Sequence, residues 1–76
     1  MAHKYIGNYY RRAEGRYFLY VACIDPDNRL FRANVYDSNG NKVGSPDLSY
    51  LEEEDLTREN CQQWIERCIR DKLGVR

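Results

Sequence analysis

Alternation of apolar and polar positions predicts β-structure in the middle of the chain. Residues 29–37 alternate with a period of two, which places Phe31, Ala33 and Val35 on one face of a strand. Residues 17–24 form a continuous hydrophobic run, which also favours a strand. The segment 25–28, Asp-Pro-Asp-Asn, is typical of a tight turn, so the two strands are predicted to form a hairpin.

A second hairpin is predicted around Asn39 and Gly40, because both residues tolerate the positive φ of a two-residue type I′ turn. In that register Asp37 faces Lys42 and Tyr36 faces Val43. The last strand of the sheet is then the short segment 42–45.

One more strand is predicted before these, over residues 4–12, which contain several tyrosines and an isoleucine. The segment Ala13-Glu14-Gly15 is interpreted as a three-residue hairpin loop with Gly15 in the left-handed conformation. The strands then follow one another as an antiparallel meander, with residues 4–12 at one edge.

The C-terminal part changes to a helical period. Apolar residues recur every three or four positions and form one stripe: Cys61, Trp64, Ile65, Cys68, Ile69 and Leu73. We expect a helix over residues 58–73, with Thr57 as the N-cap and Gly74 just beyond the C-terminal end.

The segment between the last strand and the helix leaves two alternatives open. Ser49 and Glu52 have the spacing of a capping box, which favours one short helical turn. A plain loop over residues 45–55 is the other interpretation.

These elements predict an α+β fold in which an antiparallel meander of three to four strands packs against one C-terminal amphipathic helix. With 76 residues, the chain is expected to form a single domain, residues 1–76, around one hydrophobic core. The apolar stripe of the helix accounts for one face of the sheet, so function is expected on the outer sheet face and in the acidic segment before the helix.

Charge and cysteine content narrow the function classes. Net charge is zero, but residues 1–36 carry +3, residues 37–57 carry −5 and residues 58–76 carry +2. This pattern disfavours indiscriminate phosphate binding, which needs a net basic footprint. Three cysteines are an odd set that fits a reducing compartment, and all three are interpreted as small core hydrophobes.

No apolar run reaches the ~18 residues of a membrane span, and residues 1–5 lack the core of a signal peptide. We therefore expect a cytoplasmic protein without a membrane partner.

No catalytic or metal-binding motif is found, so we expect neither an enzyme nor a cofactor. The cysteines are separated by 38 and 7 positions, without the short Cys-x-x-Cys pairs of zinc sites. The single histidine, His3, lies near the terminus, and nothing in the sequence marks an orienting acid for nucleophilic chemistry. No glycine-rich phosphate loop is present.

Seven tyrosines in 76 residues supply more aromatic surface than one helix can cover. Tyrosine rings and arginine guanidinium groups are frequent energetic anchors of interfaces. An acidic run before the helix offers a second contact for a basic groove of a partner. The predicted partner-binding residues are Tyr9, Tyr10, Arg11, Arg12, Arg16, Tyr20, Arg32, Tyr36, Glu52, Glu53 and Glu54.

Two resemblances to known families concern the layout of the chain. The basic pair Arg11-Arg12, the segment Gly15-Arg16-Tyr17, the Ile24-Asp25-Pro26 turn and a later helix resemble the three-stranded DNA-binding domains of AP2 factors and phage integrase arms. That resemblance implies a sheet that enters the major groove. Its candidate base and phosphate contacts would be Arg11, Arg12, Arg16, Arg29 and Arg32.

The stretch from Phe31 to Trp64, with its Asn-Gly turn and a Trp-bearing helix, is similar in arrangement to small phage proteins of the anti-CRISPR type. This resemblance implies an inhibitor that blocks a large nucleoprotein complex through tyrosine and charged side chains.

The leading hypothesis is a non-enzymatic module that binds a protein partner, as an inhibitor or adaptor. A sequence-specific nucleic-acid binder that uses the basic first hairpin is the alternative. A homodimer joined through the 4–12 edge strand is a third hypothesis, because that edge contains no proline.

Overall fold

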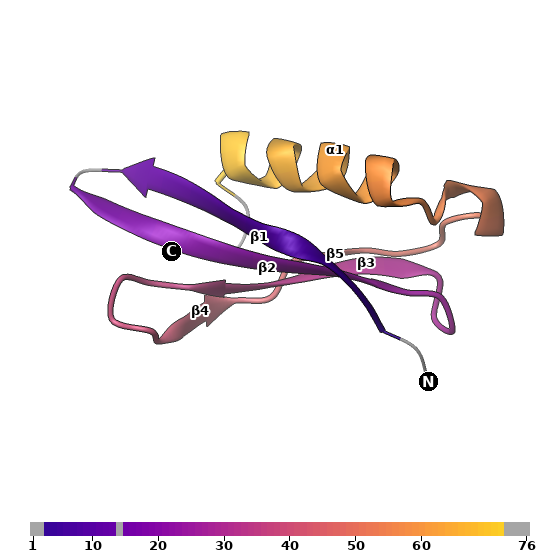
Figure 1. Cartoon of the computed structure of the whole chain (residues 1–76), viewed down its shortest axis with the longest axis horizontal. Helices are drawn as coiled ribbons and strands as arrows, with labels where there is room; N and C mark the ends of the chain where they lie inside the picture. The colour runs from indigo at the N-terminus through magenta and orange to yellow at the C-terminus, as the bar shows by residue number, and fades with distance from the viewer. Residues whose placement is uncertain (1–2, 14, 73–76) are drawn as a thin grey trace.

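The computed structural model of the protein describes residues 3–13 and 15–72. It confirms the predicted α+β fold, an antiparallel sheet with one helix packed on one face (Figure 1). The strands lie in the order β1-β2-β3-β4, and β5 pairs with the same edge of β3 as β4 does. The elements are β1 (Lys4–Ala13), β2 (Arg16–Asp25), β3 (Leu30–Tyr36), β4 (Lys42–Gly44), β5 (Asp47–Leu48), a 3-10 helix (Glu53–Asp55) and α1 (Arg58–Arg70).

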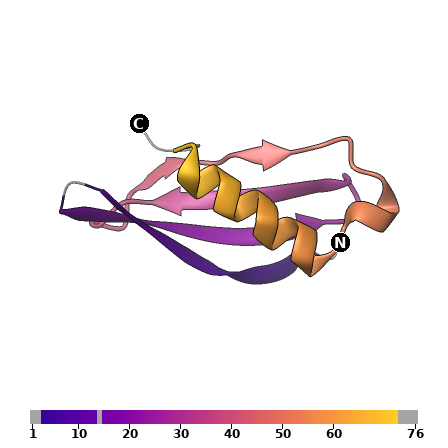
Figure 2. The ribbon, with the colours of Figure 1, turned by 90° about the horizontal axis from the view of Figure 1, so that it is seen from above.

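The core lies between the sheet and α1, which crosses the strands diagonally (Figure 2). Its members are Ile6 of β1; Phe18, Tyr20, Ala22 and Ile24 of β2; Phe31, Ala33 and Val35 of β3; and Cys61, Trp64, Ile65 and Cys68 of α1. The Phe31 and Trp64 rings meet with their centroids 5.9 Å apart. The predicted inner face of β3 and the apolar stripe of the helix are therefore the two halves of one core.

The β1–β2 hairpin has a shorter loop than the sequence analysis predicts. Ala13 pairs with Arg16, so Ala13 belongs to the strand and the three-residue loop is wrong. Gly15 does take the left-handed conformation, with φ of 75°. A left-handed glycine lets the chain reverse within a shorter loop, which leaves Ala13 free to pair. Glu14 lies outside the described residues.

The β3–β4 hairpin is confirmed, but its predicted register is wrong. Tyr36 pairs with Lys42 and Val35 pairs with Gly44. Only Gly40, with φ of 84°, is left-handed in this turn, whereas a type I′ turn needs positive φ at Asn39 as well. The backbone amides of Asn39 and Asn41 both donate to Asp37 Oδ1 at 2.9 Å, and the Asp37 backbone amide donates to the Asn41 carbonyl at 2.9 Å. These bonds close the turn between Tyr36 and Lys42 around the left-handed Gly40.

The β2–β3 turn is closed by the buried carboxylate of Asp25. Asn28 donates its backbone N–H to Asp25 Oδ1 at 3.2 Å and its side-chain amide to Oδ2 at 2.9 Å. These hydrogen bonds from Asn28 lower the pKa of Asp25 from its usual value, and His3 adds to the effect from 3.5 Å away. The carboxylate is thus committed to holding the turn.

The helix begins as predicted and ends earlier. The Thr57 hydroxyl accepts a hydrogen bond from the Asn60 amide at 3.1 Å, which confirms Thr57 as the N-cap. The helix ends at Arg70, and Lys72 takes a left-handed conformation with φ of 60°, so the predicted end at residue 73 is wrong. Leu73 and Gly74 lie outside the described residues.

The segment before the helix contains both extended and helical structure. Residues 47–48 form β5, which the sequence analysis did not predict, and residues 53–55 form a 3-10 turn. Glu52 precedes that turn and no side chain caps it, so the predicted Ser49–Glu52 capping box is wrong. Pro46 explains the extended path, because its carbonyl accepts the Ala33 amide at 3.0 Å and fastens the segment to β3.

Candidate functional site

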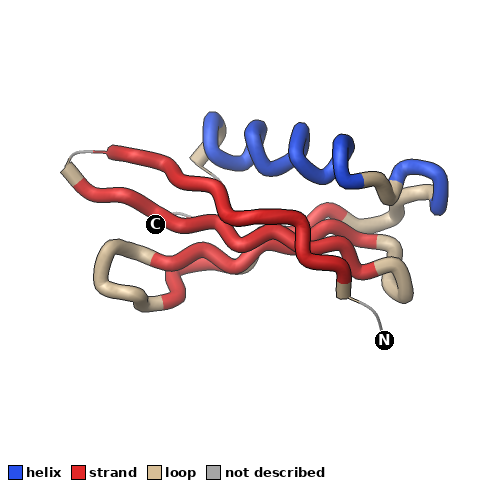
Figure 3. Tube along the Cα trace, viewed as in Figure 1, coloured by secondary structure: helices blue, strands red, loops and turns tan. Residues whose placement is uncertain are grey.

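The side of the sheet away from α1, called here the outer face, carries no helix in the described part of the chain (Figure 3). The strand alternation and register assign its residues. They are Tyr5, Asn8, Tyr10 and Arg12 of β1; Tyr17, Leu19, Val21, Cys23 and the buried Asp25 of β2; Leu30, Arg32, Asn34 and Tyr36 of β3; and Lys42 of β4 and Asp47 of β5, which are the register partners of Tyr36 and Arg32.

Cross-strand pairing arranges these side chains in rows. One row runs Tyr10, Leu19, Tyr36, so an aliphatic side chain lies between two tyrosines. The next row runs Asn8, Val21, Asn34, and the following one runs Tyr5, Cys23, Arg32. The centre of the outer face is thus the half-buried stripe of β2, and its sides are aromatic and polar.

The hairpin end of the outer face is concave. The Tyr10 and Tyr17 rings meet edge to face with centroids 5.9 Å apart. Together with Arg12 they line an open hollow of about 340 Å³. Although the two rings contact each other, both remain exposed to solvent: Tyr10 is 61% exposed and Tyr17 is 46% exposed. Two rigid rings beside a guanidinium group suit an anchor side chain from a partner.

Of the predicted site residues, the structure brings Tyr10, Arg12, Arg32 and Tyr36 together on the outer face. Tyr5, Tyr17, Leu19 and Val21 belong to the same face and were not predicted as site residues. The alternation of β3 shows which of its residues face outward. The hairpin registers extend this assignment to Tyr17, Leu19 and Val21 of β2 and to Tyr5 of β1.

Four of the predicted tyrosine and arginine site residues lie elsewhere. Tyr20 is fully buried in the core, so its assignment to a binding surface is wrong. Tyr9 pairs with Tyr20 and Arg11 pairs with Phe18, which places both on the helix side of β1. Arg16 shares the parity of Phe18 and lies exposed at the hairpin end. Neighbouring residues of a strand point to opposite faces, so Tyr9-Tyr10 and Arg11-Arg12 cannot share one surface.

The acidic residues Glu52, Glu53 and Glu54 are exposed at the other end of the molecule from the β1–β2 hairpin (Figure 2). They form the entry and first part of the 3-10 helix, on the helix side of the sheet (Figure 3). The fold therefore does not join the acidic segment to the outer face, and the two are separate surfaces.

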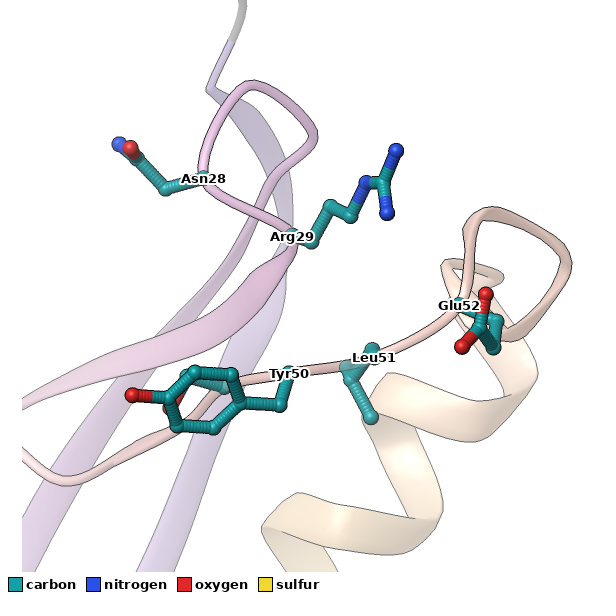
Figure 4. Close-up of a pocket in the computed structure, with 6 residues that line it drawn as sticks. Asn28, Arg29, Tyr50, Leu51 and Glu52 are labelled. Atoms are coloured by element: carbon teal, nitrogen blue, oxygen red, sulfur yellow. The ribbon is translucent and has the colours of Figure 1, made fainter.

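A second hollow, of about 500 Å³, lies beside the β2–β3 turn and is lined by residues 28–29 and 49–52 (Figure 4). Arg29 and Tyr50 both have left-handed backbones, with φ of 51° and 63°, and the Leu51 amide donates to the Arg29 carbonyl at 3.4 Å. Figure 4 shows the Arg29 side chain and the Tyr50 ring extending in opposite directions. Because its polar groups diverge, this hollow lacks the convergent set that fixes a small ligand.

The cysteines divide between core and surface. Cys61 and Cys68 are fully buried in α1, as predicted, but Cys23 is half-buried on the outer face, so its prediction as a core residue is wrong. Burial raises the pKa of Cys61 to about 12 and that of Cys68 to about 11, and it also raises the pKa of Cys23. Within residues 3–13 and 15–72, no three His, Cys, Asp or Glu side chains gather as metal ligands.

Alkylation with iodoacetamide at pH 8 is expected to modify Cys23 well before Cys61 and Cys68. The thiolate is the reactive form, and burial both withholds the reagent and keeps the two helix thiols protonated. Peptide mass spectrometry after a time course measures the order, and a sample in urea, where all three should react at similar rates, is the control. Early modification of Cys61 or Cys68 would contradict the packing of α1.

Comparisons with known proteins give no indication of function, so the proposal below rests on the geometry of the outer face. No protein-family model matches the chain, and neither the curated proteins nor the solved structures give a match. No helix in the described ranges combines the length and apolarity required to span a bilayer.

Proposed function

We propose that the chain is a small non-enzymatic binding domain that docks a protein partner on its outer face, as an inhibitor or adaptor. The observation that carries the proposal is the uncovered row Tyr10, Leu19, Tyr36, with an aliphatic centre between two tyrosines. Core-like centres with aromatic anchors and a polar rim are the usual anatomy of protein interfaces.

The chemistry of the outer face favours a protein over a nucleic acid. Its centre is uncharged, because Leu19, Val21 and Cys23 follow one another along β2. Arg12 lies at one end of the face, and Arg32 at the other lies opposite Asp47 of β5 in the strand register. The arginines that the DNA-binding resemblance implies are also dispersed, since Arg29 lies in the β2–β3 turn at the other end of the molecule from the hairpin. The matching partner surface is apolar at its centre and acidic at its rim.

A photo-crosslinking experiment tests this proposal. Tyr36 is replaced by benzoylphenylalanine, and the same replacement at exposed Glu66 of α1 serves as the matched control. In lysate of the native host, we expect a nuclease-resistant protein adduct from position 36 and none from position 66. A nuclease-sensitive adduct would instead support the nucleic-acid alternative, and adducts from position 66 alone would place binding on the helix.

With the partner identified, the double variant Tyr10→Ala, Tyr36→Ala is expected to bind at least about 30-fold more weakly, since a buried aromatic anchor contributes about 2 kcal/mol or more. Isothermal titration calorimetry measures the change, and Glu66→Ala is the control. Unchanged affinity in a folded double variant would exclude the outer face as the docking surface.

A further inference from the structure

The free edge of β1 presents backbone hydrogen-bonding groups whose direction can be derived from the side-chain contacts. Tyr17 donates its backbone N–H to the Ser38 hydroxyl at 3.2 Å, and its carbonyl accepts from the same hydroxyl at 3.1 Å. Both groups of Tyr17 therefore point toward β3, away from β1. In an antiparallel sheet this direction alternates residue by residue, so Phe18 and Tyr20 point toward β1.

The register carries this alternation into β1. Arg11 pairs with Phe18 and Tyr9 pairs with Tyr20, so these two residues of β1 use their backbone groups inside the sheet. Asn8, Tyr10 and Arg12 lie between them and direct their N–H and C=O groups outward. Ile6 lies at the irregularity in the register between Tyr5 and Gly7, outside this alternation, and its carbonyl accepts a hydrogen bond from the Arg58 side chain at 2.8 Å.

Other parts of the sheet edge are occupied. Arg58 of α1 covers the Ile6 carbonyl, and Ser38 fills the position beside Tyr17 where β3 has ended. The outer edge of β3 is taken by β4 and β5, which span only Lys42–Gly44 and Asp47–Leu48. In the described part of the chain, β1 from residue 8 to residue 12 is thus the open edge long enough to template a further strand.

Two arginines beside this edge favour an added strand with acidic side chains. Arg11 lies on the helix side, with its guanidinium 5.9 Å from the centre of the Phe18 ring, and Arg12 lies on the outer face. Two adjacent residues of an added strand also point to opposite faces. A pair of neighbouring acidic residues would therefore meet one arginine on each side of the sheet.

We propose that an extended segment of a partner protein, with two adjacent acidic residues, adds to the sheet as a strand beside Asn8, Tyr10 and Arg12. This inference rests on the proposed function and names the partner element, because the side chains of the same three residues belong to the outer face. A second copy of this chain is a poorer occupant. Antiparallel pairing of β1 with itself about Tyr10 would place Arg12 opposite Asn8 and Arg11 opposite Tyr9 of the other copy, so neither arginine would gain an acidic partner.

The test uses 15N-labelled protein and the probe peptide acetyl-Thr-Val-Asp-Glu-Val-Thr-amide. In the free protein, hydrogen exchange should be fast at the amides of Asn8, Tyr10 and Arg12 and slow at those of Tyr9 and Arg11. Adding the peptide should shift and protect the three fast amides. A peptide with Lys-Lys in place of Asp-Glu should bind about tenfold more weakly.

Two control series make the result specific. N-methylation of alternate peptide residues should abolish binding for one set of positions and spare the other, because only every second N–H faces the protein edge. The double variant Arg11→Glu, Arg12→Glu should reverse the preference in favour of the Lys-Lys peptide, and Arg67→Glu on α1 should not.

Each outcome decides a separate claim. Equal binding by both N-methylated peptides, or no response at Asn8, Tyr10 and Arg12, would overturn strand addition. In that case shifts at Leu19, Val21 and Tyr36 would leave the outer-face proposal standing. Protection of the three amides that rises with protein concentration alone would replace the acidic segment by a second copy.

Discussion

Replacement of Tyr20 by alanine is expected to lower the free energy of unfolding by about 3–5 kcal/mol, the range for removing a buried aromatic side chain. Tyr20 is fully buried between Phe18 and Ala22 on the inner face of β2, facing α1. Removing the ring leaves a cavity in the core against the centre of the sheet, and no other interaction compensates for the lost packing. A domain of 76 residues has a total stability of about 4–11 kcal/mol, so this variant should lose a large share of it and unfold at a much lower urea concentration than the wild-type protein.

The matched control is Tyr10→Ala. Tyr10 is also a tyrosine of the sheet, but it lies on the neighbouring strand β1 and its side chain points to the opposite face from Tyr20. Tyr10 is 61% exposed, and its loss should change the free energy of unfolding by less than about 1 kcal/mol. Urea titrations followed by circular dichroism measure both variants. Equal stability losses would show that the assignment of inner and outer faces is wrong.

Replacement of Trp64 by alanine is expected to cost a similar amount, about 3–5 kcal/mol. Trp64 is 7% exposed and contacts the Phe31 ring, so it joins the centre of α1 to β3. A 13-residue helix is marginal alone in water, because most helical stability in proteins comes from packing of its apolar face. Loss of Trp64 should therefore weaken the helix and the sheet together.

Glu66→Ala, on the exposed side of the same helix, is the control and should change stability by less than about 0.5 kcal/mol. Trp64 is the single tryptophan of the chain, so the Trp64→Ala variant cannot be followed by tryptophan fluorescence. Circular dichroism in urea can follow the unfolding of both variants. Loss of helical signal in Trp64→Ala at a lower urea concentration than loss of the sheet signal would contradict a shared core. Coincident transitions at a lower midpoint are the expected result.

The residues proposed for binding lie apart from the residues that stabilise the fold. The variants above affect the face that packs on α1, whereas Tyr10, Arg12 and Tyr36 lie on the opposite face. Outer-face substitutions should therefore alter partner binding with little loss of stability, which allows the two properties to be measured separately.

Local patterns in the sequence are sufficient to predict most helices, strands and turns of this protein. Alternation in residues 29–37 identified the inner residues Phe31, Ala33 and Val35, and a period of three to four identified the helix. Thr57 was correct as the N-cap, because a threonine hydroxyl before an amphipathic run satisfies an amide in the first turn. The left-handed Gly15 and the β3–β4 hairpin were also correct, since turn chemistry is local.

Which tyrosines form a surface depends on the pairing of strands, which no local pattern predicts. Tyr9 and Tyr10 are the same residue type in adjacent positions, and residues 17–24 are hydrophobic throughout, so neither strand shows its own parity. The face of each side chain depends on hairpin register, and a change of one residue in a loop exchanges the two faces. The pairing of Ala13 with Arg16, one residue tighter than predicted, is such a change. The pairing of β5 with β3 and the hydrogen bond from Arg58 to the Ile6 carbonyl likewise join segments that are distant in the chain, so no local pattern predicts them.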